Sequence, residues 1–170
     1  MAKRTQTMIV GHGDIASVLE DREGFLFFVS GVSNSQETDE AQYEREIKLL
    51  LSQDVGLHIV YVSTLAVFYS DTRYTQHKLQ VEKIIKRRFP KYTIVRIGNI
   101  TWGTNPHTLI NYLHAHPEAE VRDEYRYIVT RDEFLHWVNL IPEWSTEMNI
   151  TGKRMKVREI VDEYVRLYTK

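Results

Sequence analysis

Short apolar runs alternate with amphipathic stretches along the first hundred residues of the chain. The runs cover residues 7–10, 25–29 (FLFFV), 58–63 (HIVYVS) and 92–97 (YTIVRI), and each is followed by glycine, serine or threonine. Their length and their β-branched and aromatic content predict buried strands. The stretches 14–20, 37–52 and 74–89 have helical spacing. Strands and helices in this rhythm predict an α/β fold, with a parallel sheet of about four to six strands and helices on both faces.

Composition narrows the class of protein. The chain has 170 residues, of which 42% are hydrophobic, enough for one domain with a core. A net charge of −1 gives no basic surface for nucleic acid or for an anionic membrane. The absence of cysteine excludes disulfides, thiolate metal sites and a cysteine nucleophile, and it suits a reducing compartment. The first apolar run is too short for a signal peptide or a membrane span, so we expect a cytoplasmic protein.

A glycine-rich turn follows the first predicted strand. It reads G-x-G-x-x-A and contains Gly11, Gly13, Asp14, Ile15 and Ala16. Glycines at these positions permit a tight turn, and a pyrophosphate could then approach the N-terminus of the predicted helix 14–20. The alternative is a strand-to-helix turn that binds nothing.

A tyrosine and a lysine stand four residues apart near the start of the predicted helix 74–89. Tyr74 and Lys78 would share one face of that helix. A nearby ammonium favours the phenolate, so we expect Lys78 to lower the pKa of Tyr74 toward the range of a general base. Thr64, at the end of the strand before, can hold a substrate oxygen. The three residues predict proton transfer coupled to hydride exchange with a nicotinamide; a solvated helix pair is the alternative.

The order of these motifs resembles the extended short-chain dehydrogenase/reductases, the NAD-dependent epimerase/dehydratase family. Residues 60–69 resemble the family's strand-end segment, and Tyr74 and Lys78 match its Y-x-x-x-K motif. Residues 96–103 (RIGNITWG) resemble "R-x-x-N-x-x-G". Residues 125–134 resemble a segment that precedes a helix, and 149–152 followed by 155–168 resembles a turn and the closing helix.

The resemblance implies NAD or NADP as cofactor and a sugar-like or nucleotide-sugar substrate. It places Thr64, Tyr74 and Lys78 in the catalytic site and Asn99, Trp102 and Arg126 toward the substrate. The implied cofactor contacts are Gly11, Gly13, Asp14, Ile15, Ala16, Ser30, Gly31, Tyr74 and Lys78. It also implies a homodimer through helices 37–52 and 74–89.

The chain departs from the family in several places. The family's second and third strands are missing, and with them the residue that reads the adenosine ribose. Residues 1–170 would therefore form a single truncated Rossmann-like domain, with a small substrate-side portion from about residue 104 to 170. A right-handed crossover from the first strand to residue 25 would place helix 14–20 on the other face of the sheet. Leu65 and Ala66 stand where dehydratases carry acidic residues, which argues against dehydration.

Several of these residues have a structural interpretation as well. Asn99 could close a turn, and Arg96 and Arg126 could form surface ion pairs. Trp102, Trp137 and Trp144 would be core residues, with ligand stacking open for Trp102. His114 and His116 are two apart, so they would point to different faces of a helix and we expect no metal site.

Two functions remain: a miniature reductase or epimerase, or a relative that senses a ligand or binds a protein without turnover.

Overall fold

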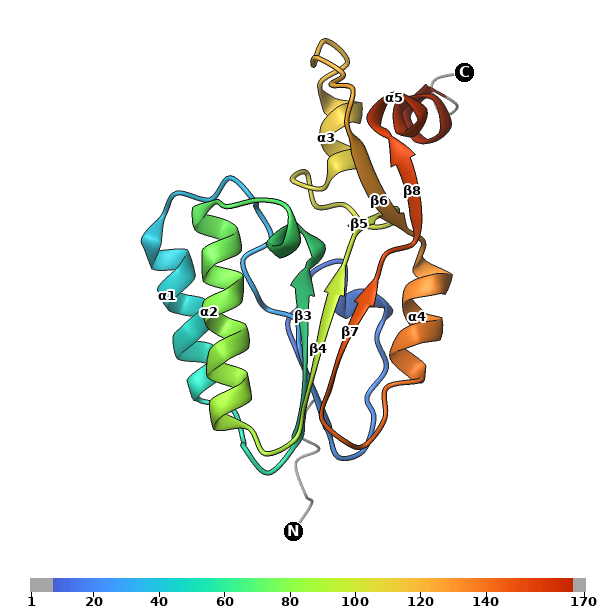
Figure 1. The fold of residues 1–170 in the computed structure, drawn as a ribbon. Helices are drawn as coiled ribbons and strands as arrows, with labels where there is room; N and C mark the ends of the chain where they lie inside the picture. The colour runs from blue at the N-terminus through green and yellow to red at the C-terminus, as the bar shows by residue number, and fades with distance from the viewer. Residues whose placement is uncertain (1–7, 167–170) are drawn as a thin grey trace.

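A five-stranded parallel sheet forms the centre of the computed structural model, which describes residues 8–166 (Figure 1). The strands are β1 (Ile9–Val10), β2 (Phe25–Phe28), β3 (His58–Thr64), β4 (Tyr92–Ile97) and β7 (Thr146–Ile150), in the order β1-β2-β3-β4-β7. All four pairings are parallel. The prediction of a reduced Rossmann-like sheet is confirmed, and residue 7 of the first predicted strand lies outside the described residues.

Two long helices cover one face of this sheet and a third covers the other (Figure 1). The first two are α1 (Glu40–Leu51) and α2 (Arg73–Arg88), and the third is α4 (Arg131–Asn139). α1 begins after Asp39, whose carboxylate accepts a hydrogen bond from the Ala41 amide at 2.9 Å. Thr72 caps α2 in the same way. These caps explain why the helices begin within one to three residues of the predicted starts.

The sheet carries a separate apolar core on each face. Leu26, Ile59 and Tyr61 pack against α1 and α2, whereas Phe25, Phe27 and Val60 pack against α4. Because side chains alternate along a strand, burial on both faces makes β2 fully apolar. This explains the uninterrupted FLFF that the sequence shows.

A small second sheet lies beyond the carboxyl ends of the main sheet (Figure 1). It contains β5 (Asn99–Ile100), β6 (Tyr125–Val129) and β8 (Lys153–Lys156), packed with α3 (Leu109–Ala115), α5 (Val157–Ile160) and the π-helical turn η3 (Val161–Val165). The closing helix was predicted to begin at residue 155, but α5 begins at Val157. Met155 lies in β8, antiparallel to β6, with its side chain buried in the local core. Residue 168 lies outside the described residues.

The predicted helix 14–20 is also wrong. This segment holds one 3₁₀ turn, η1 (Ala16–Val18), and its Ile15, Val18 and Leu19 side chains pack into the α4-side core. The connection 11–24 therefore crosses on the face opposite to α1. Since β1 to β2 and β2 to β3 step across the sheet in the same direction, the two connections have opposite hands. The right-handed placement that the sequence suggested is not found.

None of the helices within residues 8–166 is both long enough and apolar enough to cross a membrane.

Candidate functional site

Three of the predicted site residues lie together where β3 and α2 meet. Thr64 ends β3, and its hydroxyl accepts a hydrogen bond from the Ala66 amide at 3.1 Å, which starts the 3₁₀ turn η2 (Leu65–Phe68). The Thr64 side chain lies near the Tyr74 phenol and acts to lower its pKa. The Lys78 Nζ atom lies 5.5 Å from the centre of the Tyr74 ring. Sequence spacing therefore placed these residues correctly relative to one another.

Lys78 is buried against the loop after β2. Its side chain is 4% exposed, and its Nζ atom lies 3.4 Å from Glu46 Oε1. A Cβ atom at Gly31 would stand 2.6 Å from Lys78 Nζ and 2.8 Å from Glu46 Oε1. Only a residue without a side chain leaves room for this ion pair, so Gly31 belongs to the same site as Lys78.

The ionisation of Tyr74 differs from the prediction. Burial, followed by the charge of Glu46, raises the pKa of Tyr74 well above its ordinary value, and the contact with Thr64 offsets only part of that rise. The expected lowering by Lys78 is not found, because burial raises the pKa and Glu46, which pairs with the Lys78 ammonium, adds to the rise. Tyr74 is therefore a protonated phenol at neutral pH.

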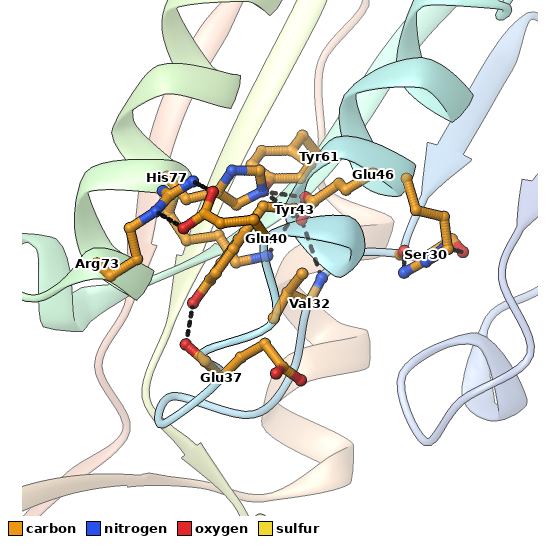
Figure 2. Close-up of polar contacts among 11 residues, drawn as sticks. Ser30, Val32, Glu37, Glu40, Tyr43, Glu46, Tyr61, Arg73 and His77 are labelled. Carbon is orange, nitrogen blue, oxygen red and sulfur yellow. Dashed lines mark hydrogen bonds and ion pairs between the residues drawn. The ribbon is translucent and has the colours of Figure 1, made fainter.

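Glu46 is the centre of a buried network that the sequence analysis missed (Figure 2). Its carboxylate accepts hydrogen bonds from the Tyr61 hydroxyl at 2.8 Å and the Val32 amide at 2.9 Å, and it pairs with His77 Nε2 at 2.7 Å. Burial raises the pKa of Glu46, but the Lys78 charge and these hydrogen bonds outweigh it and bring the pKa to about 2. A signal was present in the sequence: position 46 shares the inward face of α1 with Tyr43 and Leu50.

A second buried ionic network lies beneath β3 and β4. Glu82 of α2 accepts a hydrogen bond from the Ser63 hydroxyl at 2.7 Å and from Arg96 at 2.6 and 3.0 Å. Arg96 also reaches Glu147 at 2.8 Å. The prediction of an ion pair at Arg96 is confirmed, but its surface location is wrong: the residue is 8% exposed because β4 is a central strand whose residue 96 faces α2.

The glycine turn is tied to the loop after β5. The Asp14 carboxylate accepts hydrogen bonds from the backbone amides of Thr104 at 3.0 Å and Asn105 at 2.9 Å. Trp102 Nε1 donates to the Asp14 carbonyl at 3.0 Å. Since only the 3₁₀ turn η1 follows, the turn has no helix dipole with which to attract a phosphate.

The two glycines of this turn have different surroundings. Gly11 has φ +140°, and a Cβ atom there would stand 2.8 Å from the Val29 carbonyl oxygen. Nothing lies within 4 Å of a Cβ atom at Gly13. The turn is therefore packed closely against the end of β2 and open at Gly13.

The hand of connection 11–24 has a consequence for ligand binding. The chain leaves β1 toward the α4 face and leaves β2 toward the α1 face. In open parallel sheets, ligands bind outside the carboxyl ends of neighbouring strands whose connections diverge in this way. The β1/β2 junction keeps that arrangement, and it contains Gly11, Ser30 and Gly31.

The predicted substrate residues are engaged within the chain. Asn99 Nδ2 donates to the Tyr127 carbonyl at 3.2 Å, a contact between β5 and β6 rather than within a turn. Arg126 pairs with Glu124 at 2.7 Å.

Trp102 packs on Phe134 with ring centres 5.5 Å apart, so its core interpretation is confirmed. The same expectation is wrong for Trp137 and Trp144, which are 42% and 71% exposed at the end of α4 and in the loop that follows.

Ser30 also has partners within the chain. Its carbonyl and hydroxyl oxygens accept hydrogen bonds from Arg45 at 2.9 and 3.3 Å. Within residues 8–166, no group of three histidine, aspartate or glutamate side chains is placed to hold a metal ion.

Comparisons with known proteins place the fold. No protein-family model and no curated protein matches the chain. Among solved structures, the Bordetella bronchiseptica enzyme WbmG in complex with NAD and UDP aligns with a TM-score of 0.63 at 12% identity, over 82% of this chain and 55% of its own. A UDP-glucuronic acid 4-epimerase from Bacillus cereus, in complex with NAD, aligns with a TM-score of 0.65 at 15% identity, over 92% and 63%.

A third solved structure extends the comparison to reductases. The dTDP-4-dehydrorhamnose reductase from Bacillus anthracis, in complex with NADP, aligns with a TM-score of 0.60 at 17% identity, over 82% of this chain and 61% of its own. The chain thus spans a little over half the length of these enzymes. At such low identity the likeness concerns the fold, and this chain has a shortened form of the fold found in NAD-dependent epimerases, dehydratases and reductases.

Proposed function

We propose that the protein is an NAD(P)-dependent oxidoreductase or epimerase that acts on a sugar-like hydroxyl or carbonyl substrate. The observation that carries the proposal is the convergence of Thr64, Tyr74 and Lys78 beside Gly31, at the carboxyl ends of a parallel sheet. Solved enzymes with this fold hold NAD or NADP, and one also holds UDP. A nucleotide-sugar is therefore the substrate class to test first.

The β1/β2 junction would offer a dinucleotide an open backbone at Gly13 rather than a helix dipole. Gly13 is open on its outer side, and Gly11 lets the turn approach the end of β2. Ser30, Gly31 and Lys78 would lie along the nicotinamide half. The bound cofactor would supply or accept a hydride.

The protonated Tyr74 phenol could serve as the general acid of the reaction. A phenol that holds its proton at neutral pH can donate it to a substrate oxygen as a carbonyl is reduced. Thr64, in contact with the same phenol, would hold that oxygen in place. Leu65 and Ala66 add no carboxylate beside it, so an elimination of water has no acid or base there.

Thermal unfolding in the presence of NAD, NADH, NADP or NADPH tests the cofactor part of the proposal. A ligand that binds only the folded chain must raise the midpoint of unfolding. We expect one dinucleotide to raise it, and that result would name the cofactor for a screen of nucleotide-sugars. If none of the four raises the midpoint at millimolar concentration, hydride transfer by this chain is excluded.

Replacing the phenol tests the chemical part. We expect Tyr74→Phe to lower turnover by about 10²- to 10⁴-fold, because the proton donor is removed while the ring still packs. Tyr92→Phe, at the amino end of β4 and therefore at the opposite edge of the sheet from the site, is the matched control and should keep full turnover. Turnover of Tyr74→Phe at the rate of the unsubstituted chain would remove Tyr74 from the mechanism.

A second function, ligand binding without turnover, is favoured by one observation. Lys78 is held by Glu46 inside the protein, so its ammonium is only partly available to a ribose. Such a protein would show the thermal shift with a dinucleotide but no hydride transfer with any substrate.

We further propose a homodimer through α1 and α2. Leu51 and Leu79, on the outer faces of these helices, are 44% and 39% exposed. Sedimentation of the chain and of Leu79→Glu would test it: a dimer that the charged variant does not disrupt would have another interface.

A further inference from the structure

Glu46 is a buried carboxylate in contact with Lys78 of the candidate site. It lies on α1 (Figure 2), whereas Tyr74 and Lys78 lie on the neighbouring helix α2. Its side chain is fully buried, and its oxygens are occupied by Val32, Tyr61, His77 and Lys78. With four donors around it, this carboxylate has one fixed position.

The ion pair between Glu46 and Lys78 changes the electrostatic field at the Tyr74 phenol. An unpaired ammonium near a phenol would favour the phenolate, and a carboxylate would favour the phenol. Here both charges lie in the same buried site, with Nζ 3.4 Å from Oε1 and 5.5 Å from the ring centre of Tyr74. Their fields at the phenol oppose each other, and the lysine charge is no longer free to ionise it.

The other groups that face Tyr74 do not replace Glu46. Tyr43 of α1 and Tyr69, after η2, act on the phenol in the same direction as Glu46, while Thr64 of β3 acts against it. Of these neighbours, only Glu46 is an ionised carboxylate within the site. Arg73, at the start of α2, pairs with Glu40 at 2.7 Å on the outer surface.

We propose that Glu46 is a positioning residue of the candidate site: by pairing with Lys78 it withholds the lysine charge from Tyr74 and keeps the phenol in its proton-donating form. This inference rests on the proposed function for its meaning, since a proton donor serves carbonyl reduction.

Tyrosine titration measured by NMR on the ¹³C-labelled protein tests the proposal without any substrate. The Tyr74 signal is assigned by its loss in Tyr74→Phe. In the unsubstituted protein, we expect Tyr74 to remain protonated at pH values where an ordinary tyrosine, with a pKa of about 10, ionises. In Glu46→Gln we expect its titration to move down by about one pH unit or more. Glu46→Asp, which keeps the charge, should restore most of the original behaviour.

Tyr61→Phe is the matched control. It removes one hydrogen bond from the same carboxylate but no charge, so a merely structural role for Glu46 would make Tyr61→Phe and Glu46→Gln alike in titration. An unchanged Tyr74 titration in folded Glu46→Gln would overturn the proposal. If that variant does not fold, Glu46→Asp and the unsubstituted chain are compared instead, and a Tyr74 that ionises at or below about pH 10 in the unsubstituted chain contradicts the proposal.

The pH profile of carbonyl reduction separates this inference from the proposed function. If Glu46 acts as proposed, the loss of activity at high pH should begin at lower pH in Glu46→Gln. A shifted titration without any hydride transfer would refute the enzyme and keep the role of Glu46. Hydride transfer with an unshifted titration would support the enzyme and refute the proposed role of Glu46.

Discussion

The junction after β1 and the junction after β3 are both strand ends that the sequence marks as functional, but they are built differently. After β3, the chain turns through η2 and enters a capped helix of sixteen residues, which holds Tyr74 and Lys78 in register. After β1, it makes one 3₁₀ turn and is held by contacts with residues 102–105. The comparison shows that the Tyr74–Lys78 motif has its expected geometry because a full helix, α2, forms around it. The glycine motif lacks its expected geometry because only a 3₁₀ turn follows it.

The largest difference between the two junctions should be in their contribution to stability, because buried charges support only the junction after β3. Lys78→Met would leave the Glu46 carboxylate buried without its cation, and we expect a loss of about 3–5 kcal/mol in the free energy of unfolding. Urea denaturation measures it. Lys48→Met, in an exposed pair with Glu44, should change stability by less than about 0.5 kcal/mol. Equal losses in the two variants would mean that the buried pair adds nothing specific.

Acid should weaken the β3 junction in a defined pH range. The pKa of Glu46 is about 2 in the folded protein against an ordinary 4.5, so its contribution to stability is complete above about pH 4.5 and is lost as the pH falls toward 2. This contribution is about 3 kcal/mol. Stability measured between pH 5 and 2 should therefore fall less steeply in Glu46→Gln than in the unsubstituted protein. The exposed Glu44→Gln serves as the comparison, and a slope in Glu46→Gln as steep as in Glu44→Gln would contradict the assignment.

The smallest change in stability is expected at the junction after β1. Substitutions of its two glycines, Gly11 and Gly13, would measure that change. Gly11→Ala would force a side chain into a positive φ and to 2.8 Å from the Val29 carbonyl, at a cost of about 1–3 kcal/mol. Gly13→Ala meets open space and should be neutral or slightly stabilising. If a dinucleotide lies against Gly13, however, this second variant should bind it more weakly while remaining fully stable.

The sequence predicted the parts of the fold that repeat a simple pattern. Runs such as FLFFV and YTIVRI identify strands buried on both faces, and the capped helices α1 and α2 follow from apolar spacing. Helix 14–20 was predicted wrongly because Ile15, Val18 and Leu19 fit helical spacing, yet the connection on that face forms only a single 3₁₀ turn. The small sheet was not predicted because β5 has only two residues and β8 is largely charged.

The sequence predicted that Tyr74 and Lys78 lie close together, but it did not predict the electrostatics around them. Spacing alone brought together Tyr74 and Lys78, and the strand end supplied Thr64. The rise in the pKa of Tyr74 depended on its burial and on Glu46, which approaches from a helix about thirty residues earlier in the chain. No local pattern around residue 74 reports that contact, because it arises only when α1 and α2 pack on the same face of the sheet.

The order of the strands bears on how the chain folds. β1 to β4 are neighbours in space in the same order as in the sequence, whereas β7 joins β4 only after residues 98–145 have been placed. Closing that long segment costs more chain entropy than closing the shorter connections before it. The pairing of β4 with β7 should therefore form late and open first, and amide hydrogens of β7 should exchange with deuterium faster than those of β3.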